Sequence, residues 1–158
     1  MPRARRALAW LVAAALALAA AGAARADLLR HCATPPALDA AQQDRLFRFA
    51  ALARDTLAAA GSPAVLVARA GTDLQRFGQL HSHAGISLRA SPNTPWSVRQ
   101  LYYDCSEARP RLFDQGLPGF VLGGASPDEG HLVLWLLPDD AAAALARTAL
   151  DDHRAQAL

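Results

Sequence analysis

The chain has 158 residues, a length that suits one domain. Its 16 basic residues are all arginines and stand against 14 acidic residues. Four arginines fall within the first 26 residues, which resemble a leader, so the rest of the chain has 12 basic and 14 acidic residues, a net charge of −2. This balance excludes the basic surface that is typical of nucleic-acid binders.

The first 26 residues have the features of a secretory signal peptide. Three arginines lie near the start, residues 7–21 are apolar, and Ala24-Arg25-Ala26 has the small-x-small pattern of a cleavage site. We expect cleavage before Asp27 and a periplasmic or secreted protein that touches the membrane only through its leader. An uncleaved anchor is the alternative, but the apolar run is shorter than the roughly 20 residues of a spanning helix.

The chain has two cysteines, Cys32 and Cys105. In an exported protein an even pair indicates a disulfide. The alternative is that Cys105 is a nucleophile, but its neighbours Asp104 and Glu107 are acidic and disfavour a thiolate. We therefore predict a disulfide between the two cysteines.

An amphipathic helix is predicted next. Asp39 and Gln42 have capping-box spacing, and Gly61 is a typical left-handed stop. Apolar residues recur between them at intervals of three or four, on one helical face: Leu46, Phe49, Ala50, Ala53 and Leu57. The short apolar run of residues 64–70 then predicts a strand that is buried on both faces.

The strand predicted at residues 81–88 carries the most informative side chains. Apolar and polar residues alternate from His83 onward, and His81 and His83 are two residues apart, so their rings should leave the same face. Gly85 would let a neighbouring backbone or a substrate approach the imidazole of His83. A strand histidine beside a glycine is how several hydrolase folds present a general base.

Two other interpretations of these histidines stay open. His83 can be a core histidine whose ring nitrogens are satisfied within the fold. His81 and His83 can also form a metal pair, but no third ligand lies near them in the sequence. We predict no metal and no cofactor.

The remaining segments complete the element order. Residues 90–95 form a turn with two prolines, and the strand at 96–103 makes a hairpin with the preceding one. Residues 104–130 are rich in Gly, Pro and charge, and Asp114-Gln115-Gly116 is a turn signal. Residues 131–137 predict a central strand, and 140–156 a final helix. Three aromatic residues are expected in the core: Trp96, Phe113 and Trp135.

The order of helix, four strands and helix predicts an α+β fold. We expect an antiparallel sheet of about four strands with the helices packed on one side. Residues 27–158 form this single domain.

Four strings, in this order along the chain, resemble a bacterial family called domain of unknown function 2145 (DUF2145). They are Asp39-Ala40-Ala41-Gln42-Gln43-Asp44-Arg45, His81-Ser82-His83-Ala84-Gly85, Trp96-Ser97-Val98-Arg99-Gln100-Leu101 and Leu112-Phe113-Asp114-Gln115-Gly116-Leu117. The resemblance runs from about Cys32 to the last residue.

That family is in turn similar to permuted papain-like hydrolases, a group with NlpC-type amidases and lecithin:retinol acyltransferase-type enzymes. The resemblance implies a papain-like fold without its C-terminal part, with His83 as catalytic base and Gln100 as the residue that orients it. His81 and Gly85 would bind substrate. The group's cysteine nucleophile comes near the C-terminus, and no cysteine follows His83 except Cys105. We therefore expect a chain truncated at its C-terminus and inactive as given.

Two functions remain after these observations. The first is a cysteine-hydrolase-like scaffold of the cell envelope, of amidase, peptidase or acyltransferase type, for an amide or ester in a cell-wall or lipid-derived small molecule. The second is a non-catalytic periplasmic binding or structural domain whose cleft is lined by His81, His83 and Gln100.

Overall fold

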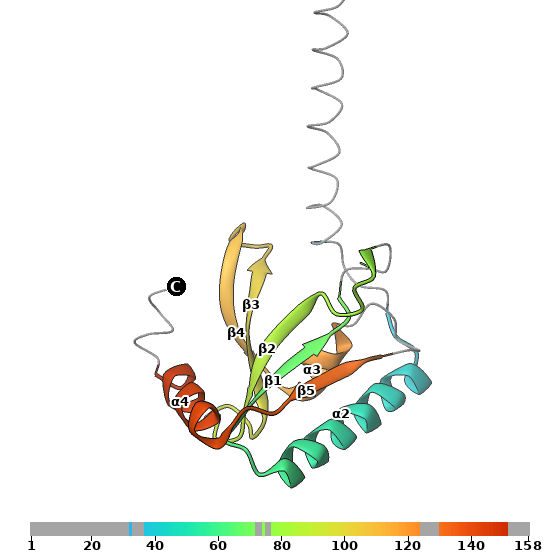
Figure 1. The fold of residues 1–158 in the computed structure, drawn as a ribbon. Helices are drawn as coiled ribbons and strands as arrows, with labels where there is room; N and C mark the ends of the chain where they lie inside the picture. The colour runs from blue at the N-terminus through green and yellow to red at the C-terminus, as the bar shows by residue number, and fades with distance from the viewer. Residues whose placement is uncertain (1–31, 33–36, 72–73, 75–76, 124–129, 152–158) are drawn as a thin grey trace, which may run out of the picture. The chain divides into compact units, whose positions relative to one another are not determined.

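The computed structural model describes residues 32, 37–71, 74, 77–123 and 130–151 (Figure 1). The predicted leader and the last seven residues lie outside this range. The chain divides into two units, residues 1–37 and 38–158, and every helix and strand described below belongs to the second unit. Among the described residues, no helix is both long and apolar enough to cross a membrane.

Helix α2 (Ala40–Ala60) begins and ends where the sequence predicts. The carboxylate of Asp39 accepts the backbone N–H of Gln42 at 2.8 Å, and the Gln42 side-chain oxygen accepts the N–H of Asp39 at 3.1 Å. Gly61 follows the helix with φ of 70°, a left-handed conformation that glycine adopts without strain. The buried stripe of the helix comprises Leu46, Ala50, Ala53 and Leu57.

The sheet has five antiparallel strands, in the order β4-β3-β2-β1-β5. They are β1 (Ala64–Arg69), β2 (His83–Leu88), β3 (Ser97–Asp104), β4 (Arg109–Gln115) and β5 (Leu132–Trp135). The predicted count of four was wrong because β4 carries Pro110 and several charges, which is the composition of a loop. An edge strand tolerates both proline and charge.

The sequence predicted a central strand at residues 131–137, and this prediction was wrong. Among the described strands, β5 pairs with β1 alone and so lies at an edge of the sheet. Its Trp135 is 67% exposed and is therefore not a core residue. Phe113 on the opposite edge strand is also partly exposed, whereas Trp96 is buried as predicted.

Helices cover both faces of the sheet, so the expectation of helices on one side was wrong (Figure 1). Val65 and Val67 of β1 pack in a cluster with α2 and with the short helix α3 (Leu117–Leu122). Ala64 of the same strand packs on the other face against α4 (Asp139–Ala149). Neighbouring residues of a strand point to opposite faces, so a strand that is apolar throughout needs cover on both.

The end of α4 is tied to the sheet by a buried ion pair. Arg99 of β3 donates from Nε to Asp114 Oδ1 at 2.7 Å and from Nη2 to Oδ2 at 2.5 Å. Its Nη1 donates to the carbonyl of Ala149, the last residue of α4. The described helix ends there, seven residues before the predicted end, and residues 152–158 lie outside the described range.

Candidate functional site

The candidate site is built where β1 ends and β2 begins. Arg69 and His83 are directly opposite each other in this strand pair, and their side chains therefore share a face of the sheet. Gln100 and Tyr102 of β3 both contact the His83 ring, so they lie on this face too. The hairpin that the sequence predicts thus brings His83 and Gln100 together.

A chain of side-chain hydrogen bonds runs from His83 across the sheet. His83 Nε2 lies 2.5 Å from Gln100 Oε1, and Gln100 Nε2 donates to Gln115 Oε1 at 2.6 Å. An amide oxygen can only accept a hydrogen bond, so the ring carries a proton on Nε2. In the neutral imidazole Nδ1 is then the acceptor atom.

Two aromatic rings frame the imidazole. The ring of Tyr102 meets it edge-on, with centroids 5.1 Å apart and an interplanar angle of 89°. Phe120 of α3, which is fully buried, lies 5.9 Å away at 38°. His83 is thus held by an amide on one side and by rings from β3 and α3 on two others.

Arg69 is a further member of this cluster that the sequence analysis did not single out. Only 5% of its surface is exposed, and its guanidinium lies over the Phe120 ring at 5.0 Å. Nη1 donates to the carbonyl of Ala70 at 2.9 Å and to that of Gly123, just after α3. An arginine at the end of an otherwise apolar, buried strand was the signal in the sequence.

The electrostatic setting of Arg69 is unusual for an arginine. Burial lowers its pKa below the ordinary value, and the Tyr102 hydroxyl opposes this shift through charge and a hydrogen bond. Its Nε is buried and has no hydrogen-bond partner within the described part of the chain. A buried donor without a partner costs about 1–3 kcal/mol, and more when it is charged.

His81 lies two residues before β2, outside the strand. Its Nε2 is buried and, like Arg69 Nε, has no partner among the described residues. No group of three or more His, Cys, Asp and Glu side chains suited to a metal ion occurs in the ranges that the structure describes. The role of His81 in ligand binding stays a prediction.

The packing of the sheet explains why position 85 is a glycine. A Cβ atom there would lie 2.5 Å from Val98 Cγ1 and 3.0 Å from the carbonyl oxygen of Arg99. Real Cβ atoms essentially never show a contact of 2.5 Å, so strand β3 occupies the space that a side chain would need. The neighbours that Gly85 admits are therefore the side chain of Val98 and the backbone of β3, and its predicted contact with substrate stays a prediction.

Both cysteines are disulfide-bonded. The chain has two cysteines, so they are bonded to each other and the predicted Cys32–Cys105 disulfide is confirmed. A sulfur in a disulfide supplies no thiolate, which removes Cys105 as a nucleophile in the oxidised protein.

We expect thiol alkylation of the denatured protein without reductant to label neither cysteine. After reduction both should be labelled, and intact-mass analysis measures the two adducts. Labelling of Cys105 alone before reduction would contradict the disulfide and return this residue to the list of nucleophiles.

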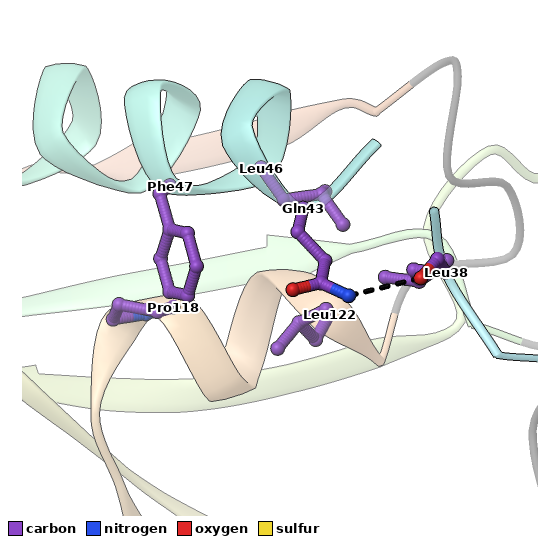
Figure 2. A pocket seen from close by; sticks show the side chains of 6 residues that line it. All are labelled: Leu38, Gln43, Leu46, Phe47, Pro118 and Leu122. Atoms are coloured by element: carbon purple, nitrogen blue, oxygen red, sulfur yellow. Dashed lines mark hydrogen bonds between the residues drawn. The ribbon is translucent and has the colours of Figure 1, made fainter. Parts of the chain in front are cut away.

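A hollow of about 270 Å³ lies between α2 and α3 (Figure 2). Its walls are mostly apolar, and the side-chain amide of Gln43 donates to the carbonyl of Leu38 at 2.9 Å. The lining residues are Leu38, Gln43, Leu46, Phe47, Pro118 and Leu122. None of these residues belongs to the hydrogen-bond chain or the aromatic frame of His83.

The fold and the site define an α+β domain with an open antiparallel sheet and a strand histidine that is held by amide and aromatic side chains. The chain belongs to the bacterial family described as "uncharacterized protein conserved in bacteria (DUF2145)", whose model matches residues 56–158. The family expectation is thus confirmed, over a shorter range than the sequence strings suggest. No curated protein and no solved structure matches the chain.

Proposed function

We propose that this chain is an exported envelope domain that binds a small cell-wall or lipid-derived ligand at His83, on a scaffold related to cysteine hydrolases. The observation that carries the proposal is the 2.5 Å contact between His83 Nε2 and Gln100 Oε1. In thiol and serine hydrolases a third side chain fixes the tautomer of the catalytic imidazole, so that its other nitrogen can act as base. Gln100 can perform this part of the chemistry here.

The site favours binding over turnover. Two side chains that could act as nucleophiles are engaged elsewhere: Cys105 is in the disulfide, and Ser87 donates to the carbonyl of Trp96 at 3.0 Å. The hydroxyl oxygen of Ser82 accepts the N–H of Gly71 at 3.0 Å. An imidazole base without a hydroxyl or thiol to deprotonate does not start acyl transfer. A histidine ring can still contribute to ligand binding through polar and ring contacts.

Two features support export. The first 26 residues resemble a cleavable leader, and the disulfide is of the kind that persists in oxidising compartments such as the periplasm. A ligand from the cell wall or the lipid phase would be available there.

We expect the mature protein to bind soluble peptidoglycan fragments without hydrolysing them or simple esters. His83→Ala should weaken binding about tenfold or more, because it removes the polar group at the centre of the site. Gln100→Leu should weaken binding less, because the ring remains but its tautomer is no longer fixed. Calorimetry measures the affinities, and chromatography of the fragments measures turnover.

His131→Ala is the matched control, since His131 is an exposed histidine outside the site. Its affinity should equal that of the unaltered protein. Hydrolysis that disappears in His83→Ala would show that the protein is an enzyme and overturn the binding proposal. Binding that is absent, or unchanged by His83→Ala, would overturn the assignment of the site.

A further inference from the structure

Among the residues that the structure describes, two arginines are buried, and they differ in one respect. Arg99 is 9% exposed, Arg69 is 5% exposed, and each donates from Nη1 to a carbonyl at the end of a helix, Ala149 for Arg99 and Gly123 for Arg69. The Nε and Nη2 edge of Arg99 binds both oxygens of Asp114. The Nε of Arg69 meets no acceptor among the described residues.

Arg69 has no carboxylate partner among the described residues. A buried cation without a counter-charge is unfavourable, and the described chain supplies Arg69 with no ion-pair partner. The planar guanidinium presents Nε and Nη2 as a fork that matches the two oxygens of a carboxylate. Arg99 shows that this chain uses the fork in that way.

The unpartnered Nε of Arg69 lies beside the proposed ligand site. Arg69 is paired with His83 across β1 and β2, and Tyr102 bonds to the guanidinium with its hydroxyl and contacts His83 with its ring. Gly71 puts no side chain between them, because a Cβ there would lie 3.2 Å from Arg69 Nη1 and 3.5 Å from His83 Cβ. Tyr102 is 36% exposed, so the shared neighbour of both groups reaches the surface.

We propose that Arg69 is a specificity residue that binds a carboxylate of the ligand held at His83, through the edge of the guanidinium that carries Nε. The inference rests on the proposed function and names the chemical class of its ligand, a small molecule with a free carboxylate next to a hydrogen-bonding group. Because Nε is buried, binding requires a side chain beside the guanidinium to move.

The first test observes the Nε–H group directly, in protein labelled with ¹⁵N-arginine. Sodium acetate is titrated at constant ionic strength against sodium chloride. We expect the resonance of the Arg69 Nε–H group to shift saturably and the exchange of this proton with water to slow. The Arg99 Nε–H group already donates to Asp114, so its resonance should not shift. An unchanged Arg69 resonance would overturn the proposal, and it would mean that the Nε–H group bonds to water or has no partner.

A parallel titration with inorganic phosphate decides the class of anion. We expect acetate to saturate the shift at a lower concentration than phosphate does. Saturation by phosphate first would overturn the carboxylate assignment in favour of a phosphate-bearing ligand.

The second test separates Arg69 from His83. N-acetyl-D-alanine and its carboxamide differ only in the carboxylate, and we expect the unaltered protein to bind the acid about tenfold more tightly. Arg69→Gln should abolish this preference, and Arg69→Lys should restore it only in part, because lysine lacks the fork. His83→Ala should weaken the binding of both ligands by the same factor.

The outcomes distinguish the two proposals. Equal binding of acid and amide, lost in His83→Ala, would overturn the role of Arg69 and leave the His83 site standing. A preference for the acid that survives in Arg69→Gln would place the carboxylate elsewhere. If Arg69→Gln fails to fold, or neither ligand binds measurably, the acetate titration of the unaltered protein decides the question.

Discussion

Replacement of Asp114 by alanine is expected to lower the free energy of unfolding by about 3–5 kcal/mol, because it removes the carboxylate that binds a buried cation through two hydrogen bonds. Both oxygens of Asp114 bind the guanidinium of Arg99, and the two side chains are 14% and 9% exposed. Once the carboxylate is removed, the guanidinium loses both of its hydrogen bonds to Asp114, while its bond to the Ala149 carbonyl remains. Denaturant unfolding followed by circular dichroism measures the loss.

The control is Asp44→Ala, which removes the partner of Arg48 in an ion pair on the exposed side of α2. That change should cost less than about 1 kcal/mol, because water solvates both exposed groups. The double change Arg99→Met with Asp114→Leu should recover most of the stability that Asp114→Ala loses. Equal, small losses for Asp114→Ala and Asp44→Ala would show that the buried pair contributes no more than a surface pair.

Phe120→Ala is the second change for which we expect a large effect, a loss of about 3–5 kcal/mol. Phe120 is fully buried in the cluster between α2, α3 and the sheet, and alanine would leave a cavity there. The change also removes the ring beneath Arg69 and one of the two rings beside His83. We therefore expect weaker ligand binding as well as lower stability.

Phe120→Leu separates these two effects. Leucine fills much of the space, so stability should fall by about 1–2 kcal/mol, while the contact of the ring with the guanidinium is lost completely. Phe47→Ala on the exposed part of α2 is the surface control, with an expected loss below about 1 kcal/mol. A loss for Phe120→Ala as small as that of Phe47→Ala would contradict the packing of α3 on the sheet.

Local patterns predicted much of the fold. The capping box at Asp39 and the glycine at position 61 fixed both ends of α2, and alternation identified β2. These features depend on residues that are close in sequence, where spacing alone carries the signal. β4 and α3 were missed for the opposite reason. β4 is an edge strand stabilised by pairing with β3, and α3 has six residues, too few to show helical periodicity.

The candidate site was also predicted only in part, and the part that was predicted depends on local pairing. His83 and Gln100 could be predicted as a pair because a hairpin joins their strands, and pairing in a hairpin is local. Gln115 was read as part of a turn, although it ends β4 and accepts the hydrogen bond from Gln100. Arg69 ends β1, and it donates a hydrogen bond to the carbonyl of Gly123, which lies 54 residues further along the chain. No local pattern encodes such a contact.

The placement of the two buried arginines on opposite faces of the sheet also protects the fold from mispairing. A slip of one residue between β1 and its neighbours would turn every side chain of β1 to the other face. Arg69 would then point toward α4 and lose the Gly123 carbonyl, while Val65 and Val67 would leave the cluster with α2. A misregistered sheet would therefore leave a cation without its hydrogen bonds and apolar side chains without their cluster. Such a state is unstable, so we expect the strands to separate and pair again.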